Sequence, residues 1–578
     1  MITRLAAVIL FVLPLAAHAD PNANSRRSHE DFTVAQLQAE MASGRLTSEA
    51  LTREYIGRIL AFDQDGPGVN SVMEMNPDAL AWARHADQLR RQGRVLGPLH
   101  GIPVLLKGNI DTGDRMQTTA GSFGLKGAPA TRDSTVAARL RAGGAVILGK
   151  TNLSEWANFR SFFSTSGWSG VGGQTNNPYG INRNACGSSS GSAAAATANF
   201  AAVSLGTETD GSIVCPANAN GVVGIKPTVG LTSRAGVVPI AHTQDSVGPH
   251  GRTVADAAAA LSVIQSRSSD GRDPATGGVP LGWTGRVRPT NIPTDYTQFL
   301  DPDGLRGARI GVTRQGIDNA PAQVIAAFDE TLDAMTAAGA TLIDLDAAGF
   351  TFASADGEFL LLCYEFRDDL RNYLATRTRV PLAGKTLDDA IVFNNANVDK
   401  EMPFFGQEIF ELTAAMALGA DAPQGDFGGM TYNQALEIDR LSGVNGIDKA
   451  LTDFDLDAVA APTDNPAWPT DLLYGDHFIF GSSGLAAGAG YPIVQVPASM
   501  VFGIPLGISF FGTAFSEPQL IKLASGFEAA TQVRAKNPPT FAATIPSDHI
   551  DGTELRKPRT AARKAKQGGP ERRRPHHL

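Results

Sequence analysis

Apolar positions alternate between helical and strand spacing along most of the chain. Between residues 32 and 59 they recur at near-helical intervals, and residues 79–92 repeat that pattern. The next apolar run, 101–106, is short and is typical of a buried strand that ends at Lys107. The same pattern predicts a helix over 136–142 and a strand over 144–148.

The alternation resumes in the second half of the chain. A strand over 308–312, a helix over 322–338 and a strand over 340–345 form a βαβ pattern, and residues 350–455 read as mainly helical. Strands that alternate with helices predict one large α/β domain, with a mixed central β-sheet covered by helices on both faces. Late strands are expected over 458–461, 493–496 and 508–511, and a closing helix over 519–531.

One segment breaks the pattern. Residues 160–190 are rich in Gly, Ser and Asn and predict a long loop, which inside a compact enzyme usually has a functional reason. An alanine-rich helix over 192–202 and a strand over 202–205 are expected to follow it. Candidate chemistry is therefore expected around this loop.

Composition adds little to this picture. Apolar residues make up 43% of the 578 residues and charged residues 19%, which is ordinary for a globular protein. A chain of this length can bury a core without disulfides or metals. The net charge of −9 argues against a nucleic-acid-binding protein.

The N-terminus has the pattern of a secretory signal peptide. Arg4 precedes an apolar run over 5–17, and Ala17-His18-Ala19 is a small-residue cleavage pattern. We expect residues 1–19 to be removed and the protein to be secreted or periplasmic, without an integral membrane span in the mature chain. The apolar run is short for a membrane span, although an uncleaved anchor stays an alternative.

The expected domain layout continues from there. Residues 20–30 form a polar leader, 31–545 the large α/β domain and 546–578 a basic tail. From Arg556 onward the tail holds nine Lys or Arg residues against Glu571, with little to bury, so it is expected to be disordered. It is either a solvated end or a tether to anionic surfaces.

The chain has three cysteines, Cys186, Cys215 and Cys363, and no two of them form a C-x-x-C pattern. Neither a zinc site nor a disulfide scaffold is therefore indicated. Buried thiols are expected, and a Cys186–Cys215 pair stays open.

Two serine-rich loops carry the candidate chemistry. The segment 186–192 is Cys-Gly-Ser-Ser-Ser-Gly-Ser, and 206–213 is Gly-Thr-Glu-Thr-Asp-Gly-Ser-Ile. Loops that enter helices leave free N–H groups, and a serine nucleophile needs a base. No histidine is near in sequence, whereas Lys107 ends an apolar strand, where burial would lower its pKa.

Residues 186–228 resemble the amidase signature, which here ends in Gly224-Ile-Lys-Pro-Thr228. The resemblance spans roughly residues 30–535. The segments 154–160 (Ser-Glu-Trp-Ala-Asn-Phe-Arg), 206–211 and 402–408 (Met-Pro-Phe-Phe-Gly-Gln-Glu) are similar to bacterial peptide amidases, which remove C-terminal amides from peptides. Three further blocks agree, namely His100–Asn109, Gly149–Trp156 and Ile504–Gly512.

The resemblance implies an amide hydrolase of the EC 3.5.1 type that needs no metal and no cofactor. By residue matching, Lys107 is the base, Ser188 the serine that holds a cis peptide bond, and Ser212 the nucleophile. The backbone N–H groups of Thr209, Asp210, Gly211 and Ser212 match the oxyanion hole. The expected partner is a small-molecule or peptide amide, not a nucleic acid.

Three positions depart from the family pattern. Cys186 stands where glycine is usual, Gly108 where many members have an acid, and Val214 where an arginine is common. Without that arginine, a substrate that needs a carboxylate anchor there is in doubt. A neutral amide is therefore expected, but peptide amides, fatty amides and aryl amides stay open, as does the oligomeric state.

Alternative functions remain at this stage. One is the glutaminase component of a tRNA-dependent amidotransferase, against which the signal peptide and Val214 argue. Another is a non-catalytic binding protein on the same fold, against which the intact triad argues. Phosphate binding lacks its glycine motifs. The aromatic residues Trp156, Phe159, Phe162 and Phe163 either line a substrate pocket or pack in the core.

Overall fold

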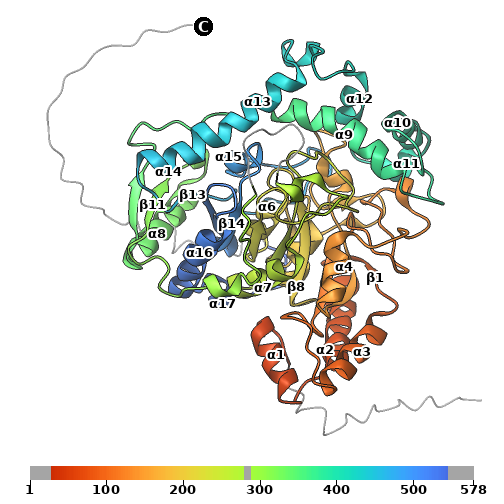
Figure 1. Ribbon diagram of the computed structural model, residues 1–578, viewed down its shortest axis with the longest axis vertical. Helices are drawn as coiled ribbons and strands as arrows, with labels where there is room; N and C mark the ends of the chain where they lie inside the picture. Colours follow the sequence, from red (N-terminus) through yellow and green to blue (C-terminus); the bar gives the residue numbers. More distant parts are fainter. Residues whose placement is uncertain (1–27, 279–287, 545–578) are drawn as a thin grey trace, which may run out of the picture.

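An eleven-stranded mixed sheet forms the centre of the computed structural model, which describes residues 28–278 and 288–544 (Figure 1). The strand order is β1-β3-β2-β8-β10-β9-β14-β15-β13-β11-β12. These strands are β1 Val72–Met75, β2 Pro103–Lys107, β3 Val146–Thr151, β8 Val203–Glu208, β9 Val223–Lys226, β10 Ser246–Gly251, β11 Arg309–Val312, β12 Thr341–Asp344, β13 Ala458–Pro462, β14 Ile493–Val501 and β15 Ile504–Phe511.

Parallel pairs lie near both ends of the sheet with antiparallel pairs between them, and the edge strand β1 pairs antiparallel with β3. Strand β2 runs parallel to both β3 and β8, and β11 runs parallel to both β12 and β13. The pairs of β8, β10, β9, β14, β15 and β13 are antiparallel. The predicted mixed sheet flanked by helices is confirmed.

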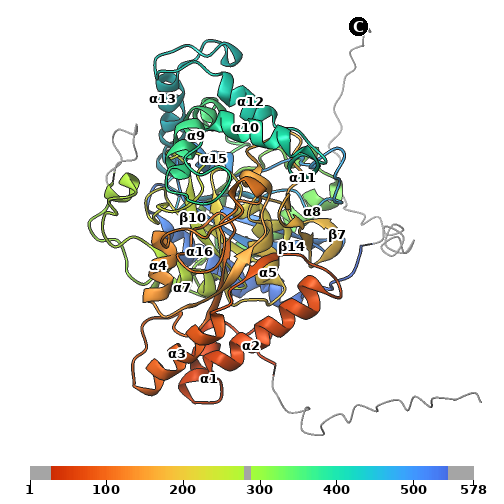
Figure 2. The ribbon, with the colours of Figure 1, turned by 90° about the vertical axis from the view of Figure 1, so that its right-hand side faces the viewer.

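The helices form separate groups around the sheet. The N-terminal helices α1 to α3 lie at one end of the molecule, and α9 to α13 lie at the other (Figures 1 and 2). Helices α4, α7, α16 and α8 contact one another in series beside the sheet, and α5 contacts α6. The bounds are α1 Val34–Ala42, α2 Ser48–Arg58, α3 Ala79–Arg91, α4 Thr135–Ala142, α5 Ser190–Thr197, α6 Val214–Ala219, α7 Val254–Ile264, α8 Ala322–Ala337, α9 Glu358–Leu374, α10 Leu387–Ala396, α11 Val398–Glu401, α12 Glu408–Ala415, α13 Tyr432–Gly443, α14 Lys449–Asp453, α15 Gly484–Ala487, α16 Glu517–Thr531 and α17 Val533–Lys536.

Helix α5 begins and ends earlier than the predicted 192–202. Asn199 adopts φ 58°, a left-handed conformation that an α-helix cannot continue through. The following residues, Phe200, Ala201 and Ala202, are buried in the turn that leads into β8. Their apolar character reflects burial in a turn, which periodicity alone does not distinguish from a helix.

The long loop contains four short strands, β4 Trp168–Ser169, β5 Gly173–Gln174, β6 Asn176–Asn177 and β7 Gly180–Asn184. The predicted signal peptide 1–19 and basic tail 546–578 lie outside the described residues, as does most of the leader 20–30. Within the described residues, no helix is both long and apolar enough to cross a membrane.

Candidate active site

Lys107 and the two serine loops meet at one edge of the sheet. Lys107 is the last residue of β2, and the loop that carries Ser212 leaves the neighbouring parallel strand β8. Because the carboxyl ends of parallel neighbours lie at the same edge, the two strands deliver these residues to one place. Ser188 precedes α5 and follows a cis peptide bond at Gly187.

Hydrogen bonds join this group. Lys107 Nζ donates to Ser188 Oγ over 2.7 Å, and to Thr207 Oγ1 over 2.9 Å. The N–H of Ser189 donates to the carbonyl of Ser212 over 3.1 Å, which ties the two loops together. Within the described residues, no hydrogen bond joins the Ser188 and Ser212 side chains. Such catalytic contacts often tighten only when substrate is bound.

Lys107 is fully buried, and burial lowers its pKa to about 7, although Asp245 and Glu208 attract its charged form. A lysine with this pKa is largely neutral just above neutral pH and can accept a proton. Ser188 is also fully buried, whereas Ser212 is 8% exposed and lines a cavity of about 340 Å³. Only the last of the three side chains is therefore open to a substrate.

The backbone before Ser212 presents unused donors. Within the described part of the chain, the N–H groups of residues 209–212 donate no hydrogen bond. The next two N–H groups, of Ile213 and Val214, both donate to Glu208 Oε2. Gly211 adopts φ 77°, where a side chain would be strained. This turn therefore leaves a set of N–H groups beside Ser212 that can stabilise a developing oxyanion.

Asp245 holds this turn in place through hydrogen bonds. Its Oδ1 accepts a 2.6 Å hydrogen bond from Thr209 Oγ1, and its Oδ2 accepts from the N–H groups of Ile240 and Ala241. Burial raises the pKa of Asp245 to about 6. Nothing in the sequence pattern identified this residue, because its role depends on a contact between segments 36 residues apart.

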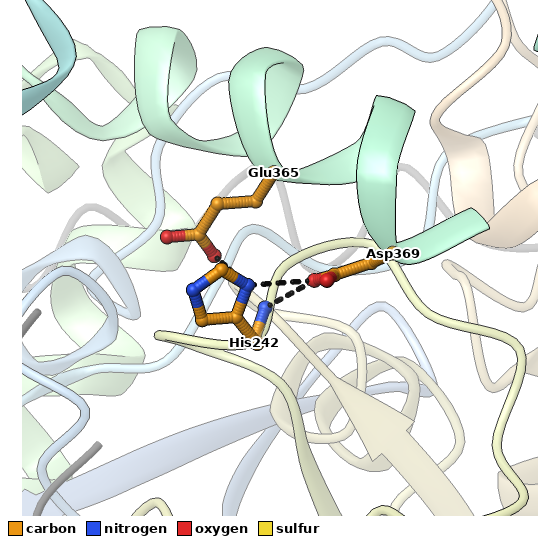
Figure 3. Close-up of side chains that lie close together, drawn as sticks. All are labelled: His242, Glu365 and Asp369. Carbon is orange, nitrogen blue, oxygen red and sulfur yellow. Dashed lines mark hydrogen bonds and ion pairs between the residues drawn. The ribbon is translucent and has the colours of Figure 1, made fainter. Parts of the chain in front are cut away.

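The loop around Asp245 is in turn held by helix α9 (Figure 3). The backbone N–H and the ring Nδ1 of His242 both contact Asp369 Oδ2, at 3.0 and 2.9 Å, and Thr243 N–H donates to Glu365. Burial alone would lower the pKa of His242, but these carboxylates outweigh it and raise the pKa. Burial also raises the pKa of Glu365 to about 7.

His242, Glu365 and Asp369 are also residue types that bind metals. Their ligand atoms lie within 4.8 Å of one another. The two carboxylates already accept hydrogen bonds from the loop, and Glu365 accepts another from Tyr432. These hydrogen bonds explain why the three side chains lie together. They attach the loop around Asp245 to α9.

Two of the three segments similar to peptide amidases, 154–160 and 402–408, contact each other. Arg160 donates to the carbonyl of Phe405 over 3.1 Å and lies over its ring at 4.5 Å from the centroid. Ser161 donates to Glu408 over 2.5 Å. Arg160 also pairs with Glu155 in the fully buried interior. Segments 154–160 and 402–408 therefore form one structural unit beside the cavity.

Aromatic residues line the cavity, but mostly not those singled out from the sequence. Phe159 lines it, whereas Trp156 is buried against Phe410 and the rings of Phe162 and Phe163 are 58% and 61% exposed. The loop before β10, helix α9 and the late loops supply the other apolar walls. These are Ile240, Phe359, Leu362, Trp468 and Phe478.

The three departures from the family pattern are all accommodated. Cys186 forms a disulfide with Cys215, while Cys363 is a buried free thiol. The expectation of free thiols is therefore wrong for Cys186 and Cys215. Val214 is buried in an apolar cluster and does not line the cavity. A side chain at Gly108 would collide with Met73.

Comparisons with known proteins show that the chain is similar to amidases over most of its length. The Amidase family model matches residues 50–521. A probable amidase of Arabidopsis thaliana is 40% identical, over 90% of this chain and 93% of its own length. The crystal structure of the peptide amidase from Stenotrophomonas maltophilia superposes with a TM-score of 0.79 at 46% identity, covering 89% of this chain and 99% of that one.

The amidotransferase relatives are more distant. A glutamyl-tRNA(Gln) amidotransferase component from Chloroflexus aurantiacus is 32% identical, over 88% of this chain and 98% of its own length. The family match covers most of the chain, and the nearer solved structures include a peptide amidase bound to the competitive inhibitor chymostatin. The chain belongs to the amidase signature family and is an amide hydrolase.

Proposed function

We propose that this enzyme hydrolyses C-terminal amides of peptides, or other neutral amides, through a Ser212 acyl-enzyme activated by Ser188 and Lys107. The observation that carries the proposal is the 2.7 Å hydrogen bond from the buried Lys107 to Ser188, next to the loop of Ser212. The similarity to the Stenotrophomonas maltophilia peptide amidase supports the substrate class.

In the proposed first step, neutral Lys107 takes the proton of Ser188 as Ser188 takes the proton of Ser212. The Ser212 oxygen attacks the amide carbonyl, and the N–H groups of residues 209–212 stabilise the oxyanion. Loss of one such donor usually costs about 3–4 kcal/mol of transition-state stabilisation. Ser188 then protonates the departing nitrogen and takes back the proton held by Lys107, the C–N bond breaks, and ammonia or an amine leaves.

Water completes the cycle. It attacks the acyl-enzyme while the same relay removes its proton, and the second tetrahedral intermediate releases the carboxylate and free Ser212. All of the proton transfers run between Lys107, Ser188 and the reacting atoms. The neutral form of Lys107, which burial favours, is therefore the active form of the base.

We also propose that the enzyme works outside the cytoplasm, with residues 1–19 removed and the basic tail 546–578 dispensable. The Cys186–Cys215 disulfide supports this location, because disulfides persist in oxidising compartments. N-terminal sequencing of native protein should begin at or near Asp20. Intact residues 1–19 on cytosolic protein would contradict the proposal.

The catalytic proposal is tested with a panel of amides and a fluorophosphonate probe. We expect ammonia release from peptide amides and covalent labelling, both lost together in Ser212→Ala. Chelators should have no effect. Labelling without turnover of any amide would contradict the substrate class, and turnover that survives in Ser212→Ala would contradict the nucleophile.

A further inference from the structure

The floor of the cavity beside Ser212 holds a carboxyl group without a partner. Asp464 follows β13, lines the cavity and is only 1% exposed. Its Oδ2 has no hydrogen-bond partner among the described residues. A buried unpaired carboxyl costs stability, so its retention in a ligand cavity calls for a function.

The neighbouring backbone makes room for this carboxyl. Asp464 pairs with Gly481 in an antiparallel bridge. A Cβ on Gly481 would lie 2.3 Å from Asp464 Oδ1 and 2.5 Å from the Phe478 ring. The absence of a side chain at this position therefore lets the Asp464 carboxyl and the Phe478 ring share one side of the cavity.

Among the described residues, the ionisable side chains that line the cavity are all carboxyl groups. Asp210, Asp464 and Asp476 line it, and no lysine, arginine or histidine is among the described lining residues. Asp476 is already used, since it accepts from Ser166 N–H, the Asn184 side chain and the Trp468 indole. Asp464 is the cavity-lining residue with a buried carboxyl oxygen that accepts no hydrogen bond from the described residues.

Electrostatics agrees with this geometry. Burial, and then the nearby Asp210 and Glu208, raise the pKa of Asp464 well above its ordinary value. Lys226 attracts Asp210, but it is fully buried and does not line the cavity. A cation that enters the cavity would therefore relieve the repulsion between these carboxyl groups and favour ionised Asp464.

We propose that Asp464, with Asp210 near it, binds an ammonium group of the substrate. The enzyme then prefers amides that carry a positive charge a few bonds from the scissile carbonyl, and discriminates against amides that carry a carboxylate there. The aromatic walls hold the apolar part of such a substrate, and Phe478 and Trp468 are lining residues whose rings can attract a cation. This inference deepens, and rests on, the proposed action at Ser212.

A binding experiment tests the subsite without requiring turnover. The ligands are straight-chain primary amides of equal length that end in an ammonium, a methyl or a carboxylate group, at several chain lengths. Their dissociation constants are measured by calorimetry with the full-length Ser212→Ala variant. We expect the best ammonium amide to bind at least about tenfold more tightly than its methyl analogue, and the carboxylate amide to bind most weakly.

Substitutions at Asp464 then test whether this residue causes the preference for the ammonium amide. In the Ser212→Ala background, Asp464→Asn should reduce the ammonium preference at least about tenfold and leave the methyl amide within about threefold. Asp464→Ala serves as a second variant, and thermal melts check that each is folded. The exposed Asp318→Asn removes the same charge away from the cavity and should change nothing.

Each outcome bears on one of the two proposals. Equal affinity for the three amides, no detectable binding of any, or a preference unchanged in both Asp464 variants would overturn the subsite. Ammonium binding that depends on Asp464, together with no amide turnover by the enzyme that retains Ser212, would support the subsite and overturn the proposed catalysis.

Discussion

Lys107 Nζ donates a 2.7 Å hydrogen bond to Ser188 Oγ at a position where neither side chain is exposed to solvent. Lys107 is the last residue of β2, and the neighbouring parallel strand β8 leads into the loop of Ser212, so both residues reach the sheet edge at which Ser188 precedes α5. The fold thus places a desolvated amine beside the buried Ser188, and of the three residues only Ser212 lines the cavity.

The first prediction concerns pH. Since the active base is neutral and burial lowers the pKa of Lys107 to about 7, kcat/KM for a non-ionising amide should rise with pH and level off above about 7. Lys107→Ala should lose about 10²–10⁴-fold in activity, with a residual rate that keeps rising as hydroxide increases. A profile of the native enzyme that is flat from about pH 5 to 9 would rule out Lys107 as the titrating base.

The second prediction concerns the disulfide. Cys186 precedes Ser188 by two residues and Cys215 follows Ser212 by three, so the bond joins the two serine loops. The two cysteines are 29 residues apart in the sequence. A disulfide across a loop of this length lowers the entropy of the unfolded chain and stabilises the folded protein by about 3–4 kcal/mol. Cys186→Ser with Cys215→Ser should lower the unfolding midpoint and reduce kcat.

Reduction of the native protein should reproduce that double variant, and Cys363→Ser serves as the control because that thiol is free. If a reducing agent lowers neither the thermal midpoint nor the activity while mass spectrometry reports free Cys186, the disulfide does not support the site.

The third prediction concerns Asp245 as a positioning residue. Asp245→Ala and Thr209→Val each remove the 2.6 Å hydrogen bond that holds the turn of N–H groups. Each should lower kcat about tenfold and change KM little, because the donors serve the transition state. In a double-mutant cycle the two effects should be strongly non-additive. Additive losses, or a loss confined to KM, would show that Asp245 does not act through Thr209.

The fourth prediction concerns substrate choice. Val214 is buried away from the cavity, and the lining residues include no cation for a substrate carboxylate. Amides of hydrophobic peptides should therefore exceed free glutamine in kcat/KM by at least about tenfold. Ammonia release measured under identical conditions gives the ratio. Comparable values for glutamine would favour the amidotransferase-type activity instead.

Sequence reasoning reached the centre of the site because its residues are marked locally. Lys107 ends an apolar strand, and the serine loops are unusual in their glycine and serine content. The fold class followed from the alternation of strand and helix patterns. The end of α5 was misplaced, because the left-handed Asn199 carries no signal in hydrophobic periodicity.

The surroundings of the site depend on tertiary contacts, and the sequence analysis missed them for that reason. Asp245 reaches Thr209 across the sheet edge, and the cover helix α9 brings Phe359 and Leu362 to the cavity. Asp464 had one available signal, since it follows an apolar strand as Lys107 does. Among the predicted aromatic residues, only Phe159 reaches the cavity, because the chain around residues 156–158 turns through left-handed conformations.

The most direct test of the account is the position of the covalent label. The enzyme is reacted with a fluorophosphonate probe, digested, and the modified residue located by mass spectrometry. We predict modification of Ser212 alone, its loss in Ser212→Ala, and weaker labelling of Ser212 in Ser188→Ala. A label on Ser188, Ser189 or Ser190 in the native enzyme would contradict the assigned nucleophile and, with it, the mechanism.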